Sequence, residues 1–175
     1  MPSCLLSVAF RAQVNQNKSY VVRQRLDCTL GRVHDSLISG RAMTRILIAD
    51  DNAMVRRALR RLIESHSDWQ VCGEAMGGQE AIERARELHP DVLVMDLVMP
   101  GMNGFEAARQ LAEFEPKLPI LLCTVQISSY VVEKAQKLGI KGAVPKSETR
   151  QITDGIAALA RHEKFYWQPR PAEAI

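Results

Sequence analysis

The sequence predicts an α/β fold in which five parallel strands form a doubly wound sheet with helices on both faces. From Thr44 onward, short apolar runs alternate five times with segments whose apolar residues recur every three or four positions. The links between these segments are short. Strands joined by helical crossovers run in the same direction, so the sheet is expected to be parallel.

The first two strand and helix pairs are well marked. A mainly apolar strand over residues 45–49 precedes a helix over residues 53–65, whose apolar residues share one face. Four arginines lie between those apolar positions and predict a solvated face: Arg56, Arg57, Arg60 and Arg61. Residues 69–75 form the second strand, and a glycine pair marks the turn into a second helix that stops before Pro90.

The other three pairs include the most apolar strand of the chain. This strand covers residues 92–95, and the fourth and fifth strands cover residues 120–123 and 142–144. Helices with apolar stripes follow each of them. Gly139 is expected to cap the end of the fourth helix, and Ser147 the start of the fifth.

Composition and charge narrow the function. The net charge is +3, but residues 1–42 contain six Lys/Arg and two Asp/Glu, which leaves 17 and 18 for the rest. The folded part is therefore about neutral, and direct nucleic-acid binding is not expected. The four cysteines show no Cys-x-x-Cys spacing, which favours free thiols in a reducing, cytoplasmic setting. No apolar run approaches the ~20 residues of a membrane span.

The chain divides into one domain and two flanking pieces. Residues 1–42 lack sustained periodicity and are expected to be a poorly ordered basic leader, and Met43 offers an alternative translation start. Residues 43–165 are expected to form the domain, with residues 166–175 as a short tail.

Polar side chains follow the predicted strands at the point where each strand ends. Asp50 and Asp51 follow the first strand, Asp96 the third, Thr124 the fourth and Lys146 the fifth. The carboxyl ends of parallel strands meet at one edge of the sheet, where open α/β folds bind ligands. We therefore expect these five side chains to converge.

This set of groups points to phosphoryl chemistry. Three carboxylates in one cleft repel each other unless a cation neutralises them, and hard oxygen ligands with room for water favour Mg²⁺. A carboxylate beside such a metal can attack phosphorus, so Asp96 is a candidate phosphoryl acceptor. Lys146 would place a positive charge at one phosphoryl oxygen, and Thr124 a hydroxyl donor at another.

With these residues in view, residues 44–162 resemble the receiver domain of two-component response regulators. The resemblance is carried by Asp50-Asp51, by Asp96 with the Met-Pro-Gly-Met-Asn-Gly segment at residues 99–104, by Thr124 and by Lys146. Receivers of the NarL/FixJ type are the most similar in character, but the helix-turn-helix output domain that follows them does not fit in the residues up to Ile175.

The resemblance implies a flavodoxin-like, three-layer fold with strand order 2-1-3-4-5. It also implies that the phosphohistidine of a sensor histidine kinase or phosphotransfer protein phosphorylates Asp96. Mg²⁺ would be bound by Asp51, Asp96 and the backbone carbonyl of Val98, and by Asp50 through water. An unknown output protein would bind the face around residues 125–146, which is also the expected surface for a phosphorylation-dependent homodimer.

Three residues depart from the family pattern. The family commonly has an aromatic residue three positions before the lysine, where this chain has Ala143, so Tyr130 is considered as a substitute. Val125 replaces the small residue that often follows the switch threonine, and is expected to restrict access to Asp96. Pro145 lacks a backbone donor, which is tolerated on an edge strand, the position implied for the fifth strand.

The sequence thus favours a stand-alone phosphoacceptor response regulator whose only chemistry is Mg²⁺-dependent self-phosphorylation and autodephosphorylation. One alternative is the receiver part of a DNA-binding transcriptional regulator. The other is a phosphohydrolase with an aspartate nucleophile. Such enzymes commonly carry a second acid two residues after the nucleophile, where this chain has Val98, so hydrolysis is disfavoured.

Overall fold

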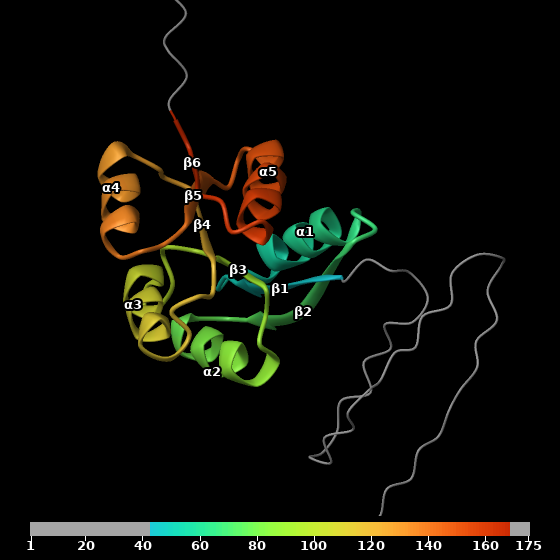
Figure 1. Ribbon diagram of the computed structural model, residues 1–175, viewed down its shortest axis with the longest axis horizontal. Coiled ribbons are helices and arrows are strands. Elements are labelled where there is room, and N and C mark those ends of the chain that lie inside the picture. Colours follow the sequence, from blue (N-terminus) through green and yellow to red (C-terminus); the bar gives the residue numbers. More distant parts are fainter. Residues whose placement is uncertain (1–42, 169–175) are drawn as a thin grey trace, which may run out of the picture. The chain divides into compact units, whose positions relative to one another are not determined.

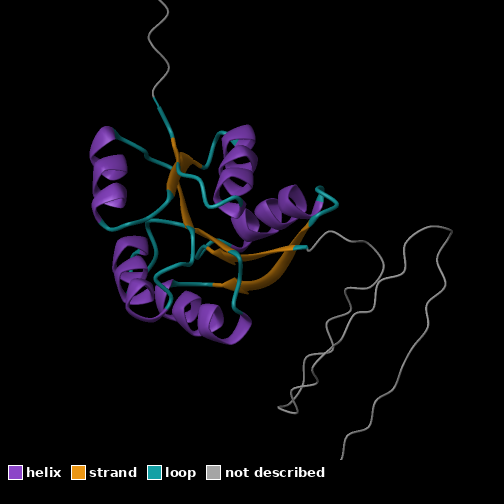
Figure 2. Cartoon of the chain, viewed as in Figure 1, coloured by secondary structure: helices purple, strands orange, loops and turns teal. Residues whose placement is uncertain are grey.

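The computed structural model describes residues 43–168, which form a six-stranded sheet flanked by five helices (Figures 1 and 2). The predicted leader and most of the predicted tail lie outside the described residues. In chain order the elements are β1 (Thr44–Ala49), α1 (Ala53–Glu64), β2 (Trp69–Ala75), α2 (Gly78–Leu88), β3 (Val92–Met95), α3 (Gly104–Phe114), β4 (Ile120–Thr124), α4 (Ser129–Lys137), β5 (Gly142–Pro145), α5 (Thr149–Ala160) and β6 (Phe165–Tyr166).

The sheet has the order β2-β1-β3-β4-β5-β6, and every neighbouring pair of strands is parallel. The predicted α/β class and the order 2-1-3-4-5 are confirmed, with one strand added. Helices α1 and α5 cover one face of the sheet, and α2, α3 and α4 cover the other (Figure 1). This arrangement brings the ends of β1, β3, β4 and β5 together at one edge.

Strand β3 lies in the middle of the molecule and is buried on both faces. Leu93 and Met95 pack in the core under α2, α3 and α4, whereas Val92 and Val94 pack under α1 and α5. All four side chains are at most 1% exposed. A strand with two buried faces is apolar throughout rather than alternating, which explains the unbroken run that precedes Asp96.

Two predictions about the last βα unit were wrong. Strand β5 is not the edge of the sheet, because β6 pairs with its residues Gly142 and Ala143. The pairing stops before Pro145, so the missing backbone donor is still tolerated there. The predicted cap, Ser147, precedes the N-cap residue, which is Glu148.

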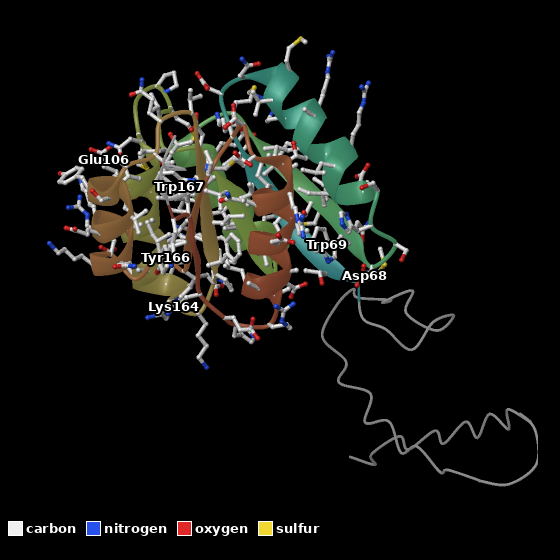
Figure 3. All side chains as sticks on the ribbon, turned by 90° about the horizontal axis from the view of Figure 1, so that it is seen from above. Asp68, Trp69, Glu106, Lys164, Tyr166 and Trp167 are labelled. Atoms are coloured by element: carbon white, nitrogen blue, oxygen red, sulfur yellow. The ribbon has the colours of Figure 1, made fainter. Side chains whose placement is uncertain are left out.

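The loop after β3 packs closely against the start of α3. Gly104 donates a backbone hydrogen bond to Leu97 at 2.9 Å. A Cβ at this position would lie 2.5 Å from the carbonyl oxygen of Asp96. This close approach to the Asp96 carbonyl therefore needs a residue without a side chain. At the same helix end, Asn103 and Glu106 form a capping box, which fixes where the helix begins (Figure 3 labels Glu106).

Replacing Gly104 by Ala should destabilise the fold, because the new methyl group meets backbone that cannot move aside cheaply. We expect a loss of about 1–3 kcal/mol in the free energy of unfolding, measured by urea denaturation. Gly77→Ala is the matched control, because its added Cβ would come no closer than 4.0 Å to another group. Equal stability of the two variants would contradict the packing described for Gly104.

Candidate functional site

Four of the five predicted side chains come from strand ends at the same edge of the sheet. Asp50 and Asp96 directly follow β1 and β3, Thr124 ends β4, and Lys146 follows β5. Lys146 Nζ lies 2.5 Å from Asp50 Oδ2 and 2.9 Å from Asp96 Oδ2. The backbone N–H of Lys146 donates to the Thr124 carbonyl at 2.8 Å, which links the ends of β4 and β5.

The site is largely shielded from solvent. Asp50, Asp96 and Thr124 are 1%, 5% and 2% exposed, and the Lys146 side chain is 14% exposed. Asp50 Oδ1 accepts a hydrogen bond from the Asn52 backbone at 2.9 Å, whereas the contact of its buried Oδ2 atom is the ion pair with Lys146. Buried carboxylates need such partners, because an unpaired charge away from water is costly.

Lys146 remains charged in this setting. Burial alone lowers the pKa of its ammonium group, but hydrogen bonds to Asp50 and Asp96 outweigh burial and raise the pKa above its ordinary value of 10.5. One ammonium group thus offsets part of the charge of two buried carboxylates.

Asp51 adds a third carboxylate from the exposed side of the site. One oxygen each from Asp50, Asp51 and Asp96 lies within 4.8 Å of the others. Within residues 43–168, this is the group of acids, histidines and cysteines close enough to bind a metal ion. The donors are all carboxylate oxygens, which fits a hard cation such as Mg²⁺. Val98 follows in the loop after β3, two residues past Asp96, with an exposed side chain.

A buried thiol lies next to these charges. Cys123 precedes Thr124 in β4 and is 1% exposed. Burial raises the pKa of its thiol to about 12, although Lys146 acts in the opposite direction. Cys123 and the half-buried Cys72 are both free, in agreement with the predicted thiols, whereas Cys4 and Cys28 lie outside the described residues.

The raised pKa of Cys123 has a consequence for stability at alkaline pH. Between its ordinary value of 9.0 and its folded value of about 12, the unfolded chain loses a proton that the folded chain keeps. Stability is thus complete below pH 9 and falls as the pH rises, by about 1.4 kcal/mol per pH unit from this thiol. Lys146 contributes with the same sign above pH 10.5.

Urea denaturation at several pH values between 8 and 11 tests this prediction. Cys123→Ala should be less stable at pH 8 because it leaves a cavity, but its stability should fall less steeply with pH. An equally steep decline in this variant would show that the Cys123 thiol is not kept protonated by the fold.

The structure places an aromatic residue beside Ala143 that the sequence did not indicate. Tyr130, considered as a substitute aromatic, is 67% exposed on α4. Tyr166 of β6 is instead in register with Ala143 and packs against the core under α2, α3 and α4. Its hydroxyl donates to the Ile140 carbonyl at 2.6 Å, in the turn between α4 and β5 (Figure 3 labels Tyr166). Val125, the residue expected to restrict access to Asp96, is 76% exposed.

One residue near the site was missed by the sequence prediction. The arginines of α1 were expected to form a solvated face, but the Arg56 side chain is only 11% exposed. It donates to the carbonyl of Asp50 and pairs with Glu74 of β2. Nothing in the sequence distinguished this arginine, because Arg57 and Arg61 have the same four-residue spacing as Arg56 and Arg60.

Comparison with known proteins agrees with this fold and site. The family described as the response regulator receiver domain matches residues 46–157. The chain therefore belongs to the receiver domain family of response regulators.

Three similar proteins illustrate the range of this family. The chain is 31% identical over 121 residues to Protein CcdB of Bacillus subtilis, covering 69% of this chain and 100% of that protein. It is 33% identical to the response regulator protein VraR of Staphylococcus aureus, covering 70% of this chain and 59% of that protein. A crystal structure of a LuxR-family two-component response regulator from Aurantimonas has a TM-score of 0.69 and 34% identity, covering 71% of this chain and 89% of that one.

The similar proteins differ in how much of their length this chain covers. The chain spans the full length of one relative and little more than half of another.

Among the described residues, none of the helices has the length and apolar character required to cross a membrane.

Proposed function

We propose that this chain is a stand-alone, cytoplasmic phosphoacceptor response regulator, in which Asp96 receives a phosphoryl group from a phosphohistidine. The donor is a sensor histidine kinase or a phosphotransfer protein. The observation that carries this proposal is the position of Lys146 Nζ, within 2.9 Å of both Asp50 and Asp96 beside a third carboxylate.

Each residue of the site has a part in the transfer. A carboxylate oxygen of Asp96 attacks phosphorus, and the bond from phosphorus to the donor's imidazole nitrogen breaks. Lys146 stabilises the negative charge on one phosphoryl oxygen, and Thr124 donates a hydrogen bond to another. Asp51, Asp96 and the carbonyl of Val98 would bind Mg²⁺, with Asp50 bonded through water. When bound there, the cation would offset the charge of the carboxylates and of the phosphoryl oxygens.

Removal of Asp51 tests the assignment of the metal ligands. Asp51→Ala should abolish the weak binding of Mg²⁺ and raise the stability of the metal-free chain, because one of three repelling carboxylates is gone. The rise should be small, since Asp51 is exposed and its repulsion is screened by water. Thermal melts with and without Mg²⁺ measure both effects. A metal-induced shift equal to that of the wild type would exclude Asp51 as a ligand.

Phosphorylation should then change the face around residues 125–146. It adds about −1.5 to −2 charges at Asp96, and Thr124 and Lys146 are placed to respond. We expect the backbone after Thr124 and helix α4 to shift between two packings. Tyr166 contacts this region through Ile140 and is the aromatic group placed to follow the shift. This face is the proposed surface for an output protein and for a phosphorylation-dependent homodimer.

Amide chemical shifts of the free chain and of its beryllofluoride and Mg²⁺ complex test the switch. We expect changes throughout residues 125–146 as well as near Asp51 and Asp96. Tyr166→Phe, which loses the hydrogen bond to Ile140, should alter the changes in α4 and leave those near Asp51 intact. Changes confined to the loops around Asp51 and Asp96 would mean that phosphorylation does not act through this face.

A second candidate is the receiver part of a DNA-binding transcriptional regulator. It is supported by the match to VraR, of which the chain covers 59%, and by the LuxR-family structure. Reading the gene beyond the codon for Ile175 separates the two candidates, because an unbroken reading frame that encodes a helix-turn-helix would favour the longer regulator. Hydrolysis of small phosphate esters is the least favoured candidate, because Val98 cannot act as an acid or base.

A further inference from the structure

Arg56 joins three parts of the fold next to the acidic cluster. Its Nη1 atom donates to the Asp50 carbonyl at 2.8 Å and lies 3.3 Å from the Asp51 carbonyl, to which it also donates. Its Nε atom pairs with Glu74 Oε2 at 3.1 Å. One guanidinium on α1 thus connects β2 to the backbone of two residues of the acidic cluster.

Glu74 is itself held in place on both sides. Its other oxygen pairs with Arg60 Nε at 2.7 Å, and Arg60 also pairs with Glu64 at 2.8 Å. Burial alone raises the pKa of Glu74, but hydrogen bonds from Arg60 and Arg56 outweigh burial and lower it. Glu74 therefore stays ionised and fixes the guanidinium of Arg56 in one orientation.

The backbone at Asp50 and Asp51 needs such support because the strand has ended there. The N–H of Asp50 still donates to Ala75 of β2 at 3.1 Å, but Asp51 lies in a bend before α1 begins. The position of the Asp51 carboxylate depends on this bend, since its side chain is exposed and not held by packing. Hydrogen bonds from Arg56 to both carbonyls restrict the bend.

We propose that Arg56 is a positioning residue for the acidic cluster, which holds the bend so that the Asp51 carboxylate stays beside those of Asp50 and Asp96. This rests on the proposed function, in which Asp51 binds Mg²⁺ and Asp96 accepts the phosphoryl group. The positive charge of Arg56 by itself would weaken Mg²⁺ binding, because it repels the cation. Weaker Mg²⁺ binding after substitution would therefore indicate that Arg56 positions the cluster, and tighter binding would indicate that its charge dominates.

Three variants distinguish these effects. Arg56→Lys keeps the charge but cannot reproduce the planar fork that reaches both carbonyls and Glu74. Arg56→Gln removes the charge as well. Arg60→Gln is the matched control, because it breaks a pair with the same Glu74 and leaves the contacts to Asp50 and Asp51 intact.

Calorimetric titration with Mg²⁺ provides the readout, with amide chemical shifts of Asp50 and Asp51 recorded in the metal-free state. We expect both Arg56 variants to bind Mg²⁺ roughly tenfold more weakly, as for other residues that orient metal ligands, and both amide signals to move. Arg60→Gln should keep the wild-type affinity, although it loses comparable thermal stability. If Arg56→Lys does not fold, Arg56→Gln carries the same test.

Three outcomes would overturn the proposal: wild-type affinity in both Arg56 variants, tighter binding in Arg56→Gln, or an equal loss in Arg60→Gln. The first would show that the bend needs no support, and the second that charge dominates. The third would show that the loss of affinity comes from disrupting the Glu74 network in general, and not from the contacts of Arg56 to the two carbonyls. Phosphoryl transfer, on which the proposed function depends, is tested in a separate experiment on the wild-type chain. A wild-type chain that binds Mg²⁺ but accepts no phosphoryl group would contradict the proposed function and leave the role of Arg56 intact.

Discussion

Asp96→Asn should incorporate no phosphoryl group from a small phosphodonor in the presence of Mg²⁺, whereas the wild-type chain should incorporate one. The amide has nearly the same shape as the carboxylate, so the fold is retained, but it is not a nucleophile and cannot form an acyl phosphate. It also loses a charge opposite Lys146 Nζ, which lies 2.9 Å from Asp96 Oδ2 in the wild type.

Intact-protein mass spectrometry after incubation with the donor measures this effect. Asp154→Asn is the matched control, because Asp154 is a half-exposed acid on α5 that pairs with Arg150 at 3.8 Å and lies outside the site. It should be phosphorylated like the wild type. Label that persists in Asp96→Asn at the wild-type level would show that another residue is the acceptor.

Lys146→Ala should lose both stability and phosphoryl transfer. The substitution leaves Asp50 and Asp96, 1% and 5% exposed, without their shared counter-charge. Breaking a buried ion pair from one side costs about 3–5 kcal/mol, and we expect the lower end because Lys146 reaches solvent. Mg²⁺ should restore part of the stability, since it offsets the same two charges. Transfer should slow by roughly 10²-fold, the usual effect of removing one preorganised charge.

Thermal melts in EDTA and in Mg²⁺, together with the rate of phosphorylation, test this expectation. Lys137→Ala at the exposed end of α4 is the control and should change neither. A Lys146→Ala chain as stable as the wild type in EDTA would show that the two aspartates need no counter-charge, which the short distances to Nζ argue against.

The fold and the meeting of the site residues at one edge of the sheet could be predicted from the sequence, because both follow from the order and direction of the strands. The run over Val92–Met95 has no polar position, which marks a strand buried on both faces, and the acids follow such strands directly. Once the strands are known to be parallel, Asp50, Asp96 and Lys146 must meet at one edge, and the ion pairs of Lys146 show that they do.

The features that escaped prediction depend on contacts between distant segments. Strand β6 has two residues, too few for any periodic pattern, and it exists because Phe165 and Tyr166 pair with β5. The difference between Arg56 and the exposed Arg57 on the same helix depends on Glu74, which lies 18 residues further along the chain. Helical spacing alone gave all four arginines the same environment.

Reductive trapping of the phosphorylated chain tests the central claim most directly. Borohydride reduces an aspartyl phosphate to homoserine, which peptide mass spectrometry then locates. After incubation with a phosphorylated histidine kinase and Mg²⁺, we predict homoserine at position 96 and at no other aspartate. Homoserine at Asp50 or Asp51, or no homoserine in a chain that binds Mg²⁺, would contradict the assignment of Asp96 as the phosphoryl acceptor.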